Sequence, residues 1–262
     1  MRFQPLRALA GALLLAGLRP AAPAGAQPAP AALEDELREL KAQNEALNHR
    51  LDELAKAVDD VAFFVRLQGV AEVDKWRITG PPPANVKNPK AAGATNPVKF
   101  YTYTFFPKDR KPGEKLPLLL LPHGGVHADF TTYHVHILQE LLAQGYAVVA
   151  PEYRGSTGYG GGFYRLIDYG GREVDDCHAA VKWALESFDF LDAGRVGLVG
   201  WSHGGLIVLF EAFRHPDVYK CCYAGVPVSD LVQRMGYSDD EYRRLFSAPD
   251  RQSGAPPAMN GS

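Results

Sequence analysis

The strongest constraint on the fold is the turn at residues 200–204, GWSHG, which has the pattern G-x-S-x-G. An apolar run at 195–200 leads directly into it, and the apolar stretch GLIVLFEAF follows. A strand that turns sharply into a helix holds its central serine in a strained backbone conformation with the hydroxyl above the sheet, and small neighbours let strand and helix approach. The pattern therefore predicts an exposed nucleophilic serine, Ser202.

A serine that forms acyl intermediates also needs hydrogen-bond donors aimed at the developing oxyanion. The backbone N–H of His203, directly after Ser202, is the first expected donor. The sequence HGG at 123–125 follows an apolar run, where a second donor belongs. We expect this donor to be the amide of Gly125, with Gly124 as the alternative. A glycine pair after a strand also occurs in ordinary tight turns, but the turn at Ser202 favours the oxyanion role.

The rest of the chain alternates between short apolar runs and helical patterns. Continuous apolar runs occupy residues 116–122, 146–151, 195–200 and 219–228. Helix-like stretches at 131–144 and 172–187 lie between them, which indicates an α/β fold with a mostly parallel sheet and helices on both faces. Two earlier segments, 73–79 and 99–106, predict further strands, and the Pro- and Gly-rich segment 80–97 predicts an extended loop.

Segments of the chain resemble a known family. They are LLPHGG, PEYRGSTGYGGGF at 151–163, REVDDCHAAVKWALES at 172–187 and RVGLVGWSHGG at 195–205. In this order they resemble the catalytic domain of the prolyl oligopeptidase family, in its acylaminoacyl-peptidase and dipeptidyl-peptidase-like branch. The resemblance covers residues 116–230. It implies an α/β-hydrolase fold over residues 70–246, serine-dependent cleavage of a peptide or acyl substrate, and no cofactor.

The resemblance also assigns roles to residues. It implies that Ser202 is the nucleophile and that His203 and Gly125 supply the oxyanion donors. Arg154 and an aspartate, either Asp175 or Asp176, are expected to be structural, through a charge pair that holds the glycine-rich loop. Asp230, after the next strand, is likewise expected to be structural.

The chain departs from the family pattern in two respects. Many members carry a large β-propeller before the catalytic domain, whereas a heptad helix precedes it here. α/β-hydrolases place their triad in the order Ser, Asp, His, yet neither histidine after Ser202 is expected to take its proton. His203 points its ring away, and His215 lies about 20 Å farther along a helix. We therefore expect a fold that is incomplete at its C-terminus and a chain that is inactive as given.

Both ends of the chain carry segments of different character. Residues 1–26 combine basic residues, a short apolar run and small residues up to Ala26, which predicts a signal peptide and an exported protein, periplasmic or extracellular. An uncleaved anchor is the alternative, although the run is shorter than the about 20 residues that span a bilayer, and no membrane span is expected after cleavage. Residues 247–262 predict a disordered tail, either a non-native ending such as a frameshift or a natural flexible tail.

Apolar residues follow an unbroken 4-3-4-3 spacing from Leu33 to Val65, with Asn44 in the one polar place. This stripe predicts a coiled-coil helix over residues 33–66. A lone asparagine at an a position favours a parallel homodimer, because the two amides bond each other across the seam. The alternative is an amphipathic helix that folds back onto the chain's own domain.

Composition excludes several classes of function. The chain has 28 Lys and Arg against 30 Asp and Glu, so a nucleic acid is not an expected partner. Its 3 cysteines are predicted to be buried thiols, since neither a disulfide framework nor a zinc site is suggested. No metal site is predicted from the histidines that lie close in sequence, because they cannot share one face: His123, His127, His134 and His136.

Two classes of function follow from these features. The first is an exported serine hydrolase of the family, either a peptidase or an esterase, that forms an acyl-enzyme at Ser202. The second is a non-catalytic hydrolase relic, tethered by the coiled coil, that binds a partner. Labelling by a serine-directed phosphonate distinguishes the two classes.

Overall fold

The computed structural model describes residues 31–84, 86, 88–239 and 242–243. The chain divides into two units, residues 1–42 and residues 43–262. Of the first unit the structure describes the start of a helix, and the α/β fold belongs to the second. The predicted signal peptide and the predicted tail lie outside the described residues.

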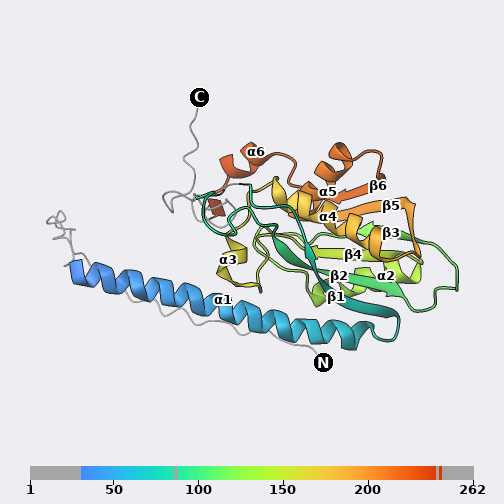
Figure 1. Cartoon of the computed structure of the whole chain (residues 1–262), viewed down its shortest axis with the longest axis horizontal. Helices are drawn as coiled ribbons and strands as arrows, with labels where there is room; N and C mark the ends of the chain where they lie inside the picture. Colours follow the sequence, from blue (N-terminus) through green and yellow to red (C-terminus); the bar gives the residue numbers. More distant parts are fainter. Residues whose placement is uncertain (1–30, 85, 87, 240–241, 244–262) are drawn as a thin grey trace, which may run out of the picture. The chain divides into compact units, whose positions relative to one another are not determined.

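The elements follow the predicted alternation of strands and helices (Figure 1). The strands are β1 (Ala71–Thr79), β2 (Lys99–Pro107), β3 (Leu116–Leu120), β4 (Ala147–Glu152), β5 (Leu191–Trp201) and β6 (Tyr219–Gly225). The helices are α1 (Ala31–Leu67), α2 (Val135–Ala143), α3 (Gly160–Tyr164), α4 (Arg172–Ser187), α5 (His203–Arg214) and α6 (Leu231–Gly236), with a 3-10 turn, η1 (Thr132–His134), before α2. The short helices α3 and α6 were not predicted, and α3 begins with three glycines, which have low helix propensity.

The described strands form a 6-stranded sheet in the order β1-β2-β4-β3-β5-β6. The strands β4, β3, β5 and β6 pair in parallel. The two early strands join the same sheet in antiparallel fashion, since β1 pairs with β2 and β2 pairs with β4. The described residues of the connecting segment 80–97 contain neither helix nor strand. A mostly parallel sheet is therefore confirmed.

Alternate residues of the central strands enter two separate cores. Leu118 and Leu120 lie in the core that α4 and α5 cover. Leu119 and Leu121 lie in the other core, which α2 and the last turns of α1 cover. Successive side chains of a strand point to opposite faces, so a strand with helices on both sides must be apolar throughout. This explains the continuous apolar run and confirms the prediction of helices on both faces.

The strand β6 forms an edge of the described sheet. Cys177 on α4 is buried, whereas Cys221 and Cys222 on β6 are exposed. The prediction that all the cysteines are buried is therefore wrong for this pair. The physical reason is that no described element covers the outer side of β6, so an apolar run that reads as an interior strand lies at the edge.

Opposite faces of α1 have different surroundings. From Leu47 to Val65 the apolar residues of the predicted stripe are 61–64% exposed. On the other side of the helix Lys56, Phe63 and Leu67 are buried, and they occupy the c and f positions of the same heptads. The helix therefore does fold back onto the domain, but through the face that the stripe leaves free. No helix in the described residues is long and apolar enough to cross a membrane.

Candidate active site

Ser202 occupies the sharp turn between β5 and α5 with φ 56° and ψ −118°. This is a left-handed region that a residue with a side chain adopts at a cost of about 1 to 3 kcal/mol, so surrounding contacts must impose it. The Ser202 N–H donates to the Gly225 carbonyl at 3.1 Å. Its carbonyl accepts from Leu206 at 3.0 Å and from Val228 at 3.2 Å. The turn predicted from G-x-S-x-G is therefore present.

The glycines of the motif are explained by space. A Cβ atom on Gly200 would lie 2.4 Å from the Gly204 carbonyl oxygen. A Cβ atom on Gly204 would lie 2.4 Å from the Pro122 carbonyl oxygen and 2.9 Å from that of His123. Backbone therefore packs directly on backbone here, which presses the loop after β3 against the start of α5.

The predicted oxyanion loop lies beside the serine. A Cβ atom on Gly124 would be 3.5 Å from the Ser202 Cβ and 3.1 Å from the Trp201 carbonyl oxygen. Gly125 has φ 78°, which favours glycine. Within the described part of the chain the amides of Gly125 and His203 donate to no backbone or side-chain acceptor. The structure thus brings together Ser202 and the two loops that carry the predicted oxyanion donors.

Residues that the sequence did not single out hold this loop in place. The buried Tyr153 hydroxyl donates to the Gly125 carbonyl at 2.8 Å, and its ring stacks on His123 at 4.2 Å. His123 Nε2 lies 2.8 Å from the Ser156 hydroxyl, which itself donates to the Tyr153 carbonyl. Burial lowers the pKa of His123 to about 3, so this ring is neutral at physiological pH and keeps its contact with the Ser156 hydroxyl. Its role is to support the loop.

The rings of His203 and His215 lie beside groups other than the serine. All 8 histidines of the chain belong to the described residues. The His203 ring is buried, with Nε2 3.5 Å from Glu173 Oε1. The His215 ring stacks on His178 at 3.7 Å. Among the described residues the Ser202 hydroxyl makes no hydrogen bond, so no base is seen to activate it.

The buried charge pair resolves the open choice between two aspartates. Arg154 donates to both carboxylate oxygens of Asp176, at 2.8 and 2.7 Å, and its backbone N–H donates to the same carboxylate at 3.0 Å. Burial raises the pKa of Asp176, against the opposing effect of the guanidinium. Arg154 also donates to the Pro81 carbonyl at 2.8 Å, so it ties the glycine-rich loop to the segment after β1. Asp175 instead pairs with Arg172 at 2.8 Å. The structural role predicted for Arg154 holds.

Asp230 is structural as expected. It is the N-cap of α6, and its side chain accepts from the Gln233 N–H at 2.8 Å. A side-chain oxygen at this position satisfies one of the N–H groups that the first helical turn leaves without a partner.

A buried lysine joins α1 to the loop beyond Gly125. Lys56 Nζ lies 3.2 Å from Glu152 Oε1 and 3.0 Å from Asp60 Oδ1, and it donates to the Phe130 carbonyl at 2.6 Å. The Phe130 N–H donates to both oxygens of Glu152 at 3.2 Å. This lysine cluster (Lys56, Asp60, Glu152 and the Phe130 backbone) therefore fixes the helix and the loop to the end of β4.

Burial raises the pKa of Glu152 to about 7, and the positive charge of Lys56 opposes this shift. The cluster was not predicted, because a lysine and an aspartate on a helix ordinarily lie in solvent. One signal was present in the sequence: Phe63 and Leu67 are apolar yet lie off the heptad stripe, on the side of the helix that Lys56 occupies.

The four histidines that are close in sequence do not gather. His123 bonds Ser156, while His127 and His134 each lie near a different backbone carbonyl, at 2.9 and 3.1 Å. A different set, His178, Glu211 and His215, brings its ligand atoms within 4.8 Å of one another. The sequence did not suggest this set, because its members come from two helices.

Residues 132–255 match the sequence profile of the prolyl oligopeptidase family. The acylamino-acid-releasing enzyme of Sus scrofa is 32% identical over 165 residues, which are 62% of this chain and 22% of that protein. Dipeptidyl peptidase 8 of Homo sapiens is 32% identical over 166 residues, which are 60% of this chain and 18% of that protein. The chain thus spans about a fifth of the length of these relatives.

Solved structures share the fold. The acylaminoacyl peptidase of Pyrococcus horikoshii matches with a TM-score of 0.54 at 21% identity, over 68% of this chain and 27% of that one. An acylaminoacyl peptidase in complex with Z-Gly-Gly-Phe-chloromethyl ketone matches with a TM-score of 0.53 at 22% identity, over 66% and 26% of the two chains. The α/β-hydrolase fold predicted from the resemblance is confirmed.

Proposed function

We propose that this chain belongs to a serine-type peptidase of the prolyl oligopeptidase family, whose sequence profile residues 132–255 match, and that it forms an acyl-enzyme at Ser202. The observation that carries the proposal is the strained backbone of Ser202, with φ 56° and ψ −118°, against the Gly124 loop. Strain of this kind persists where surrounding structure over-determines it, and it clusters at active sites.

The chemistry assigned to the site is acyl transfer. The Ser202 hydroxyl attacks the carbonyl carbon of the substrate, and the carbonyl oxygen becomes an oxyanion. The backbone N–H groups of His203 and Gly125, which have no acceptor in the part of the chain that the structure describes, stabilise this charge. The intermediate collapses as the bond to the amine or alcohol of the substrate breaks, and that leaving group takes up the proton given up by the Ser202 hydroxyl. Water then attacks the acyl-enzyme, which releases the acid and restores the Ser202 hydroxyl. A peptide or another acyl compound can serve as the substrate, so esterase activity is the second form of the same chemistry.

Turnover by the chain as given is expected to be slow. Attack by a serine requires a base within about 3 Å that takes its proton. Of the 8 histidines, all of them described, none is hydrogen-bonded to the Ser202 hydroxyl. An enzyme of this type that lacks a member of its triad still accelerates the reaction about 10³- to 10⁴-fold over the rate in water, because the oxyanion donors and substrate binding remain.

An activated aryl ester tests the role of Ser202, because its leaving group departs without a general acid. We expect the chain to be acylated once, at Ser202, with slow release, as measured by mass spectrometry of the peptides. Ser202→Ala abolishes this acylation, whereas Ser187→Ala, at the exposed end of α4, leaves it unchanged. Equal acylation of the Ser202→Ala variant would instead support the non-catalytic class. If the chain hydrolysed a peptide rapidly and this activity required Ser202, the expectation of slow turnover would be wrong, but the role of Ser202 would stand.

The exposed stripe of α1 supports a homodimer as the form in which the protein acts. The face of α1 that carries Lys56 and Phe63 is already covered by the chain's own domain, yet the stripe from Leu47 to Val65 is not covered. A second copy of the same stripe is its matching partner, since a and d residues pack into each other in a parallel coiled coil. Asn44 at an a position specifies the register.

Sedimentation of the full chain tests the dimer. Leu54→Lys places a charge in the stripe and is expected to convert the dimer to a monomer, whereas Ala46→Lys, at an exposed c position, leaves it intact. A wild-type chain that sediments as a monomer at tens of micromolar, an order-of-magnitude choice for a short coiled coil, would exclude the homodimer.

Export completes the proposal. The composition of residues 1–26 supports cleavage after Ala26 and a periplasmic or extracellular location. N-terminal sequencing of the protein recovered from the expressing cell is expected to begin at Gln27. A mature protein that begins at Met1 or Arg2 would exclude cleavage.

A further inference from the structure

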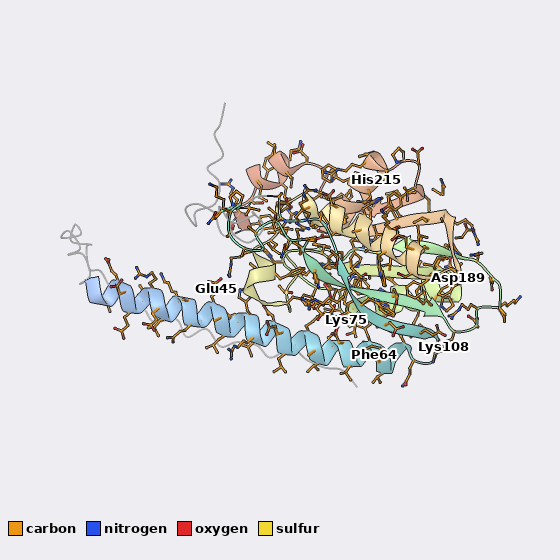
Figure 2. All side chains as sticks on the ribbon, viewed as in Figure 1. Glu45, Phe64, Lys75, Lys108, Asp189 and His215 are labelled. Atoms are coloured by element: carbon orange, nitrogen blue, oxygen red, sulfur yellow. The ribbon has the colours of Figure 1, made fainter. Side chains whose placement is uncertain are left out.

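A second group of ionisable side chains lies at the end of α5 remote from Ser202. His178 comes from α4 and Glu211 from α5. His215, which Figure 2 labels, caps the C-terminus of α5. One ligand atom from each lies within 4.8 Å of the others. α5 has 12 residues, and at 1.5 Å per residue its ends are about 18 Å apart. The group is therefore separate from the candidate active site.

The helices bring these side chains together for simple reasons. Residues four apart on a helix share a face, which places Glu211 and His215 side by side. The His178 ring stacks on the His215 ring with centroids 3.7 Å apart. His178 and His215 are half-buried, so solvent reaches both rings, whereas Glu211 is fully buried.

The Glu211 carboxylate is incompletely satisfied. Its Oε2 accepts from the Tyr219 hydroxyl at 2.5 Å and lies 3.1 Å from His178 Nδ1. Its Oε1 is buried and has no hydrogen-bond partner. No lysine or arginine pairs with this carboxylate among the described residues. Buried carboxylates are ordinarily paired with a cation or coordinate a metal, and here the carboxylate that has an oxygen without a partner lies beside two imidazoles.

We propose that His178, Glu211 and His215 bind a divalent transition metal ion of the zinc class. Two histidines and a carboxylate are a ligand set that Zn²⁺ takes, with ligand distances of about 2.0 to 2.2 Å. Ligands in such a tetrahedron lie about 3.4 Å apart, so the atoms now within 4.8 Å move closer together when the half-buried rings rotate. Tyr219 serves as the outer partner that orients the carboxylate. The bound ion links α4 to α5, the helix that begins directly after Ser202.

Zinc titration of the full chain tests the site. To remove competing thiols, the exposed pair is replaced first, as Cys221→Ser with Cys222→Ser. We expect this protein to bind one Zn²⁺ by calorimetry. His178→Gln and His215→Gln each weaken binding at least tenfold, while His136→Gln, an exposed histidine on α2, leaves it unchanged. Loss of binding on replacement of Cys221 and Cys222, or equal binding by all the histidine variants, would overturn the proposal.

Thermal unfolding supplies a second readout that does not depend on affinity alone. A ligand that binds only the folded state raises the unfolding temperature. Zn²⁺ is expected to raise it in the protein with Cys221→Ser and Cys222→Ser and in His136→Gln, and to leave it unchanged in His215→Gln, whose fold is checked by circular dichroism without metal. Co²⁺ in place of Zn²⁺ should give the visible bands of nitrogen and oxygen ligation. A protein without the exposed cysteine pair that shows neither the thermal shift nor these bands has no such site.

Discussion

Replacement of Lys56 by methionine is expected to destabilise the α/β unit, and more so at high pH. Lys56 is 3% exposed, and its Nζ lies 3.2 Å from Glu152 Oε1. Asp60 keeps Lys75 and Tyr103 as partners in the variant, whereas the fully buried Glu152 loses its lysine. Methionine keeps the apolar stem of the side chain, so the variant isolates the contribution of the amine.

The size of the effect follows from the burial of the pair. Removal of one partner of a buried ion pair costs about 3 to 5 kcal/mol, because the other charge is left uncompensated. Burial already raises the pKa of Glu152 from 4.5 to about 7, although Lys56 opposes it. Without Lys56 this pKa rises further, so the carboxyl takes up a proton near neutral pH and part of the cost is avoided.

The sign of the pH dependence is fixed by linkage. A carboxyl whose pKa is higher in the folded than in the unfolded chain stabilises the fold at low pH, and that stability is lost as the pH rises from the unfolded pKa to the folded one. For the wild type, the rise in the pKa of Glu152 from 4.5 to about 7 corresponds to a loss of about 3 kcal/mol across that window. In the Lys56→Met variant the loss continues above pH 7.

Urea unfolding at about pH 6 and about pH 9 measures this difference. We expect Lys56→Met to lose about 3 to 5 kcal/mol at the higher pH and clearly less at the lower. Lys41→Met, an exposed position on the same helix, should change stability by less than about 0.5 kcal/mol. Adding Glu152→Gln to Lys56→Met should restore most of the loss at high pH. A loss that is equal at both values, or below about 1 kcal/mol, would refute the role assigned to the pair.

Two further substitutions test the packing of the site, both by thermal unfolding. Gly204→Ala places a Cβ atom 2.4 Å from a backbone carbonyl oxygen and should lower the free energy of unfolding by at least about 1 to 3 kcal/mol. Gly162→Ala is the control, because its Cβ atom meets nothing within 4 Å, and it should be neutral or stabilising. Similar losses of stability in the two variants would contradict the packing reasoning. Arg154→Lys keeps the charge but loses the fork that grips Asp176, and should cost about 1 to 3 kcal/mol. Asp175→Asn is its control, and an equal loss there would refute the assignment.

Local signals in the sequence predicted the part of the site that neighbouring residues build. Gly200 is needed because a Cβ atom there would meet the Gly204 carbonyl oxygen, so the steric reason for this glycine lies within one turn of chain around Ser202. The apolar strands could also be predicted from the sequence, because a strand buried on both faces shows no alternation of apolar and polar residues. Ion pairs between segments distant in sequence could not be predicted in this way. Asp175 and Asp176 are adjacent in sequence, and only the packing of α4 decides which of them meets Arg154.

The two faces of α1 show why the remaining contacts were missed. Apolar periodicity identifies the stripe from Leu47 to Val65, which is exposed in the single chain. The face that contacts the domain includes Lys56, Asp59 and Asp60, whose charges read as a solvated surface. Asp59 accepts from the Thr132 N–H at 2.9 Å, and Lys56 has its partners on Glu152 and Phe130. When the polar side chains of a helix face form their hydrogen bonds and ion pairs with residues distant in sequence, the apolar spacing along the helix does not reveal that the face is buried.

The strained backbone at Ser202 has a consequence for the order of folding. Gly225 on β6 and the Pro122 carbonyl in the loop after β3 hold the turn in its conformation, and both are distant from it in sequence. We therefore expect the left-handed conformation to be imposed only after the sheet has assembled, on the native side of the folding barrier. Glycine at this position relieves the strain without loss of a packed side chain, so Ser202→Gly should slow unfolding and leave the folding rate unchanged.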